Sequence, residues 1–177
     1  MDSKIGSIWR IWDLHVHSPQ TYGGNYTDFI NNARNCKADV IGINDYCSLN
    51  GYDEISKLGG IPGKTIFPVV EFRMHNIVAN RKNPDPLKAG VKINFHIIFD
   101  NAIELFSSIQ TWLNSLECYN DKGETIQLGV ATDFSKLTFD FEKVVESLKK
   151  LNLLEKHYLI WLPYDEYGGI DDIEPDD

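Results

Sequence analysis

The most restrictive feature of the sequence is a short, almost unbroken apolar run, Val40-Ile41-Gly42-Ile43-Asn44-Asp45. A strand with one wet face alternates apolar and polar residues, whereas a nearly continuous apolar run is typical of a parallel strand covered on both faces. We therefore expect a buried parallel strand here, with a carboxylate at its end.

The rest of the chain alternates between strand and helix patterns. Strands are expected at residues 10–17, 40–45, 65–74, 91–100 and 158–162, and helices at 28–35, 50–58, 102–117 and 140–151. Loops are expected at 19–25 and 80–90, and Lys122-Gly123 is expected to turn a small hairpin with a strand at 125–130. Thr27 or Asp28 is the expected cap of the first helix. This alternation is typical of a parallel α/β fold, and 177 residues fit one domain.

Two histidines end the first expected strand, in Asp13-Leu14-His15-Val16-His17-Ser18-Pro19. Residues i and i+2 of a strand point to the same face and lie about 6–7 Å apart along the chain. Two imidazoles placed side by side suit one metal ion, although two surface histidines near a chain end remain the alternative.

Three later strands bring further candidate ligands: Asp45, Glu71 and His96. In parallel α/β folds the functional site forms at the carboxyl ends of the strands, so we expect these residues to meet the histidine pair at one rim. For His96 the alternative is an ordinary half-buried strand histidine. Asp45 is a candidate catalytic residue that orients or binds a metal, or a turn or helix-capping residue.

Two residues are candidates for substrate binding. Arg73 follows Glu71 by two positions on the same face, and its guanidinium can bind a phosphate or only neutralise the glutamate. Tyr46 can contact a phosphate or simply fill space. Glu71 lies in an apolar strand, and a buried carboxylate needs a metal or a cationic partner.

Charge and composition exclude several classes of protein. The net charge of −9 argues against wrapping by nucleic acid, but not against a nucleic-acid substrate beside bound metal ions. Three widely spaced cysteines fit a reducing cytoplasm, and no apolar run approaches the roughly 18 residues of a membrane span. Gly-x-Ser-x-Gly and P-loop motifs are absent, so neither a serine hydrolase nor an ATPase is indicated.

Four ordered blocks resemble the PHP (polymerase and histidinol phosphatase) family: Asp13–Ser18, Ile41–Tyr46 followed by Asn50–Tyr52, Val70–Arg73, and Asn94–Phe99. The similarity covers residues 8 to 100 well. More narrowly, the chain is similar to PHP domains at the N-terminus of large ATPase proteins, some linked to DNA repair or phage defence.

The resemblance implies a distorted (β/α)7 TIM-like barrel and a metal site for phosphoester hydrolysis. His15 and His17 would bind one ion, Glu71 would bridge two ions, and His96 would bind the second. The implied cofactors are two divalent ions, and histidine with carboxylate suits Zn, Mn or Fe.

The chain also departs from the family pattern. Tyr46 stands where the family has a histidine, Leu162-Pro163 replaces its His-Pro, and its closing Asp-x-His does not occur. We therefore expect no third metal and an incomplete barrel, with residues 1–177 forming a single domain at the N-terminal part of a longer protein.

Two functions are consistent with these observations. The first is a cytoplasmic, metal-dependent phosphoesterase, a nuclease or nucleotide phosphatase in DNA repair or phage defence, acting on a nucleic acid or nucleotide and associated with an ATPase domain or subunit. The second is a degenerate, non-catalytic PHP-like module that serves as a scaffold or regulator of an ATPase partner.

Overall fold

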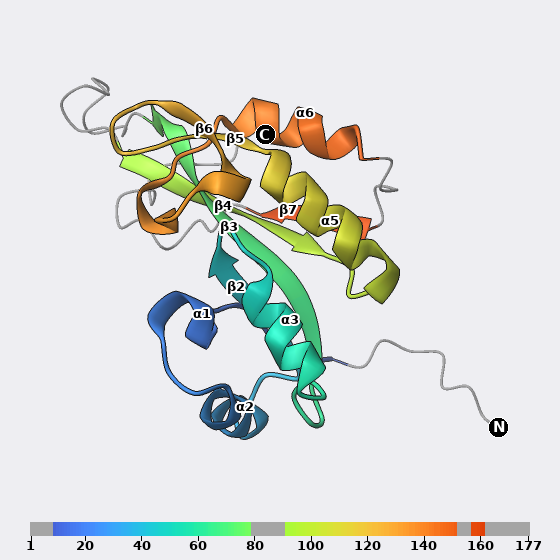
Figure 1. Ribbon diagram of the computed structural model, residues 1–177. Coiled ribbons are helices and arrows are strands. Elements are labelled where there is room, and N and C mark those ends of the chain that lie inside the picture. Colours follow the sequence, from blue (N-terminus) through green and yellow to red (C-terminus); the bar gives the residue numbers. More distant parts are fainter. Residues whose placement is uncertain (1–8, 79–90, 152–156, 162–177) are drawn as a thin grey trace.

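The computed structural model describes residues 9–78, 91–151 and 157–161 (Figure 1). Its centre is a five-stranded sheet in the order β1-β2-β3-β4-β7. The strands are β1 (Trp12–Val16), β2 (Val40–Tyr46), β3 (Thr65–Val78), β4 (Val91–Phe99) and β7 (Tyr158–Trp161). The expected loop at 80–90 and the pair Leu162-Pro163 lie outside the described residues.

The sheet is mixed, and the expectation of a distorted (β/α)7 barrel is wrong. Strands β1, β2 and β3 pair in parallel, but β4 is antiparallel to both β3 and β7. Because β4 returns beside β3 in the opposite direction, the repeating parallel unit that builds a barrel is interrupted. Within the described residues the sheet stays open, with β1 and β7 at its edges.

The helices follow the expected segments closely. They are α1 (Pro19–Tyr22), α2 (Tyr26–Arg34), α3 (Asn50–Lys57), α5 (Ile103–Ser115) and α6 (Phe141–Lys149). The cap of α2 is Asn25, whose side chain accepts from the backbone of Thr27 and Asp28, rather than either of those residues. The expected loop at 19–25 contains α1, which begins at a proline and is capped by Ser18.

A second, two-stranded sheet pairs β5 (Glu117–Tyr119) with β6 (Thr125–Gln127), so the expected strand at 125–130 is shorter than predicted. Two 3-10 turns follow, η1 (Leu128–Val130) and η2 (Phe134–Lys136). This region packs beside the upper part of β3, where Met74 forms a bridge with Phe139.

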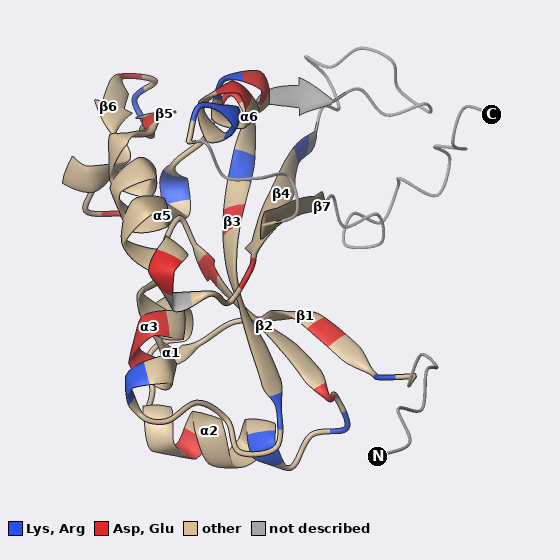
Figure 2. Cartoon of the chain, turned by 90° about the vertical axis from the view of Figure 1, so that its right-hand side faces the viewer, with Lys and Arg blue, Asp and Glu red and all other residues tan. Residues whose placement is uncertain are grey.

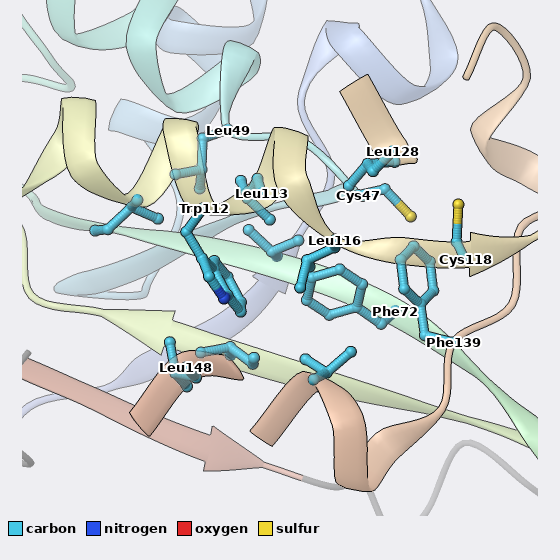
Figure 3. Close-up of a cluster of buried hydrophobic side chains, with 14 of the residues drawn as sticks. Cys47, Leu49, Phe72, Trp112, Leu113, Leu116, Cys118, Leu128, Phe139 and Leu148 are labelled. Carbon is cyan, nitrogen blue, oxygen red and sulfur yellow. The ribbon is translucent and has the colours of Figure 1, made fainter. Parts of the chain in front are cut away.

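Helices α2, α3, α5 and α6 pack on one face of the main sheet, as the side view shows for α2, α3 and α5 (Figure 2). Alternate strand positions supply the core on that face: Ile41, Ile43, Val70, Phe72, Phe95, Ile97 and Phe99. Figure 3 shows Trp112 and Leu113 of α5 and Leu148 of α6 in the same buried cluster as Phe72. The intervening positions, among them Glu71 and His96, point to the opposite face.

None of the helices in the described part of the chain combines the length and the apolar character needed to cross a membrane.

Candidate metal centre

An irregularity in β1 turns the two histidines onto the face away from the helices. Asp13 pairs with Ile41, but Val16 pairs with Ile43, so β1 uses one residue more than β2 over the same stretch. The extra residue is a β-bulge and reverses the alternation of sides. Val16 consequently packs into the core beside Ile43, and His15 and His17 lie on the face of Glu71.

Three ligand atoms converge there. The Nε2 atoms of His15 and His17 are each 3.3 Å from Oε2 of Glu71, and they are 3.2 Å from one another. The relative exposure of the side chains is 24% for His15, 13% for His17 and 1% for Glu71. The three groups are therefore partly shielded from water but reachable.

These separations fit a bound ion. Ligands arranged tetrahedrally at about 2.0–2.1 Å from zinc lie about 3.3–3.4 Å from one another. The three observed distances nearly equal the edges of that tetrahedron. Two histidines and one carboxylate are also the ligand set of hydrolytic zinc sites, which keep the fourth position open.

Two buried asparagines fix the Glu71 carboxylate. Asn44 donates from Nδ2 to Oε2 over 2.8 Å, and Asn94 donates from Nδ2 to Oε1. Burial alone would raise the pKa of Glu71, but the interactions of its carboxylate with His15, His96 and Asn44 hold the pKa below its usual value. Glu71 is therefore an ionised and oriented candidate ligand.

His96 lies beside the triad without joining it. It pairs with Glu71 across β3 and β4, and its ring meets the His15 ring edge-on, with 4.8 Å between centroids. Its Nε2 is not among the three clustered ligand atoms, and within the described residues this buried nitrogen has no hydrogen-bond partner. The antiparallel register of β4, rather than the expected meeting of strand ends, brings His96 here.

Asn44 sets the protonation of His96. Because the Nδ2 of Asn44 donates to Glu71, its Oδ1 faces His96 Nδ1, at 3.2 Å, and must accept a hydrogen bond from the N–H at that position. The neutral ring then carries a lone pair on Nε2. Burial lowers the pKa of His96 to about 4, against the attraction of Glu71, and burial likewise lowers the pKa of His17.

Asp45 is buried and turned to the other side of β2, toward the β1–α1 connection. It accepts hydrogen bonds from Ser18 N and Oγ, at 3.1 and 2.7 Å, and from Thr21 Oγ1, at 2.6 Å. The structure does not bring its carboxylate into the ligand cluster, and its contacts fit the turn-holding interpretation of this residue. Its catalytic role remains a prediction.

The two candidate substrate residues border the triad. Tyr46 pairs with Glu71 across β2 and β3, and its ring lies 5.0 Å from the His17 ring. Burial raises the pKa of the Tyr46 hydroxyl, so it stays protonated. Arg73 is exposed on the Glu71 face, and its Nε donates to Asn94 Oδ1 over 3.3 Å.

Sequence reasoning missed the asparagines and Trp161. Asn44 interrupts an apolar strand, and this isolated amide is the signal that could have singled it out. Asn94 gives no such signal, because its role depends on the antiparallel register that places it opposite Arg73. Trp161 pairs with His96, and the two ring centroids are 5.0 Å apart.

A comparison with protein-family models finds no match for this chain, and a comparison with curated proteins finds no similar sequence.

Proposed function

We propose that the chain is a metal-dependent phosphoester hydrolase with its metal at His15, His17 and Glu71. One observation carries the proposal: three ligand atoms, from β1, the end of β1 and β3, stand 3.2–3.3 Å apart, which is the spacing of ligands around a tetrahedral ion. Zinc, manganese and iron all accept this ligand set. With three ligands from the protein, one coordination position remains for water or substrate.

A bound divalent ion supplies Lewis acidity at the phosphate and makes a nearby water more acidic. The protein's own groups do the rest. Arg73, exposed beside the triad, provides a forked donor for phosphate oxygens. His96 presents an unprotonated Nε2 near His15, a suitable acceptor for a proton or for a second ion.

For the substrate class, the proposal relies on the resemblance to the PHP family. The ordered blocks that resemble the PHP family support a nuclease or a nucleotide phosphatase, working in the cytoplasm in DNA repair or phage defence beside an ATPase domain or subunit. The net charge of −9 disfavours a long nucleic-acid footprint. A nucleotide or a chain end is therefore the substrate we favour.

The test measures hydrolysis of p-nitrophenyl phosphate and bis(p-nitrophenyl) phosphate by the full chain, loaded in turn with zinc, manganese and iron. We expect turnover that EDTA abolishes and that falls at least about 100-fold in His15→Ala and Glu71→Gln. His157→Ala is the matched control, because His157 pairs with Asp100 and not with the triad. Metal-replete protein that hydrolyses neither ester would contradict the proposal.

One observation favours the non-catalytic alternative. The described residues gather a single ligand cluster, and His96 is not part of it. A scaffold or a regulator of an ATPase would bind metal at the triad but would not hydrolyse phosphoesters. Metal binding that depends on Glu71, combined with no hydrolysis of either ester, would be the result that selects this second function.

A further inference from the structure

A cavity of about 310 Å³ lies beside Tyr46, at the end of β2. Thr21 and Tyr46 line one side of it, and Thr132, Phe134 and Ser135 line the other. Its size is at the lower end of the range for small-molecule sites. The cavity thus lies between α1 and the end of β2 on one side and the η2 region on the other, segments that are far apart in sequence.

The cavity is next to the candidate metal centre. Tyr46 lines it and also packs on the His17 ring, with 5.0 Å between the ring centroids. Thr21 lines it and is held by Asp45 through a hydrogen bond of 2.6 Å. A ligand in the cavity would therefore contact Tyr46, whose ring packs directly on a residue of the triad.

The lining selects against phosphate inside the cavity itself. None of the described residues that line it is a lysine or an arginine, and Asp133 adds a carboxylate. Oδ1 of Asp133 accepts from Ser135 N and Oγ, while Oδ2 is 3.8 Å from Lys136. Hydroxyl groups are the natural hydrogen-bond donors to such a carboxylate, whereas the negative charge of Asp133 would repel a phosphate placed in the cavity.

The lining also includes two aromatic rings, those of Tyr46 and Phe134, and the hydroxyl groups of Thr132 and Ser135. Rings of this kind stack on planar groups, and base stacking on aromatic side chains tolerates any base. An uncharged ligand with a planar ring and free hydroxyls satisfies both features. A carboxylate that binds a ribose hydroxyl is a recurrent arrangement in nucleotide sites.

We propose that this cavity binds the nucleoside part of a nucleotide whose phosphate reaches the His15–His17–Glu71 site. The inference rests on the proposed function for the phosphate end, but the nucleoside end can be tested alone. The chain is then a nucleotide phosphatase, or a nuclease that grips a terminal nucleotide, rather than an enzyme for long nucleic acid.

The experiment titrates adenosine into the full chain in EDTA, by calorimetry, so that no metal contributes. We expect saturable one-to-one binding, and binding weakened about tenfold or more in Thr132→Arg, whose side chain fills the cavity. Thr27→Arg is the matched control, because Thr27 is exposed on α2, away from the cavity. Circular dichroism checks that both variants fold.

Three results would overturn the inference: no saturation by adenosine, equal weakening in both variants, or equally tight binding of ribose, which lacks the planar ring. The same titrations with zinc-loaded protein then test whether one nucleotide occupies the cavity and the metal site together. Adenosine monophosphate should bind more tightly than adenosine, and His15→Ala should remove only that difference. If adenosine binds but the chain hydrolyses no phosphoester, the proposed function fails while the nucleoside site stands.

Discussion

Asn44 links the triad to His96. Its amide donates to Glu71 and its carbonyl oxygen accepts from His96, so one side chain orients a ligand and fixes a tautomer. Residues that form hydrogen bonds to a metal ligand commonly affect metal affinity strongly, because they orient that ligand. At the residue scale, the candidate site is therefore a network centred on Glu71 rather than three independent ligands.

The change Asn44→Ala tests this network. It leaves His96 Nδ1 buried without its acceptor and removes one donor from Glu71, so we expect a loss of about 1–3 kcal/mol in unfolding free energy. Zinc affinity should fall about 10–100-fold. Urea unfolding and a competitive zinc titration measure the two effects. Asn31→Ala, an exposed change on α2, should alter neither; equal behaviour of the two variants would contradict the network.

Local patterns predicted part of the site. The strand-end spacing placed His15 and His17 side by side and led to the expectation that Glu71 would join them, as it does. Asp45 was expected at the same rim, but it sits at a position of β2 that faces the opposite side. A one-residue bulge decides which side a histidine faces, and a bulge leaves no clear trace in hydropathy.

At the scale of elements, the packing of α3 against the β1–α1 connection holds the end of β2 in place. Gly51, in the first turn of α3, sits directly over Ser18 and Asp45, so a Cβ there would meet Ser18 Oγ and Asp45 Oδ2 far inside van der Waals contact. The absence of a side chain lets the helix approach the buried carboxylate.

We therefore expect Gly51→Ala to destabilise the protein, although alanine is the better helix former. Overpacking of this kind typically costs about 1–3 kcal/mol, which urea unfolding would detect. Asn50→Ala, at the preceding exposed position, serves as the control and should be close to neutral. A stabilised Gly51→Ala variant would show that α3 does not pack as tightly as described.

Element positions were largely predictable, but strand direction was not. Local sequence patterns located β2, α3 and α6 to within a few residues. The pattern of β4 is equally compatible with either direction, because alternation carries no polarity. Its antiparallel pairing with β3 and β7 depends on contacts between distant segments, and for that reason the barrel expectation failed.

At the scale of the whole molecule, a metal at the candidate centre would cross-link two strands. His15 and His17 come from the edge strand β1 and its end, and Glu71 comes from the central strand β3. The core lies on the opposite, helix-covered face of the sheet. An ion bound here would therefore tie β1 to β3 on the face of the sheet opposite the core clusters.

Metal should consequently raise thermal stability. Zinc at about 100 times its dissociation constant adds about 2.7 kcal/mol, which corresponds to roughly 5–10 °C for a chain of this size. Differential scanning calorimetry with zinc, and then with excess EDTA, measures the shift and its reversal. His157→Ala should keep the shift and His15→Ala should lose it; an equal shift in both would mean that zinc binds elsewhere.

The most direct test of the central claim is a calorimetric titration of zinc into the metal-free full chain. We predict one equivalent bound by the original protein and by His157→Ala, and loss of that equivalent in Glu71→Gln. Less than half an equivalent in the original protein, or full binding in Glu71→Gln, would contradict the assignment of His15, His17 and Glu71 as a metal centre.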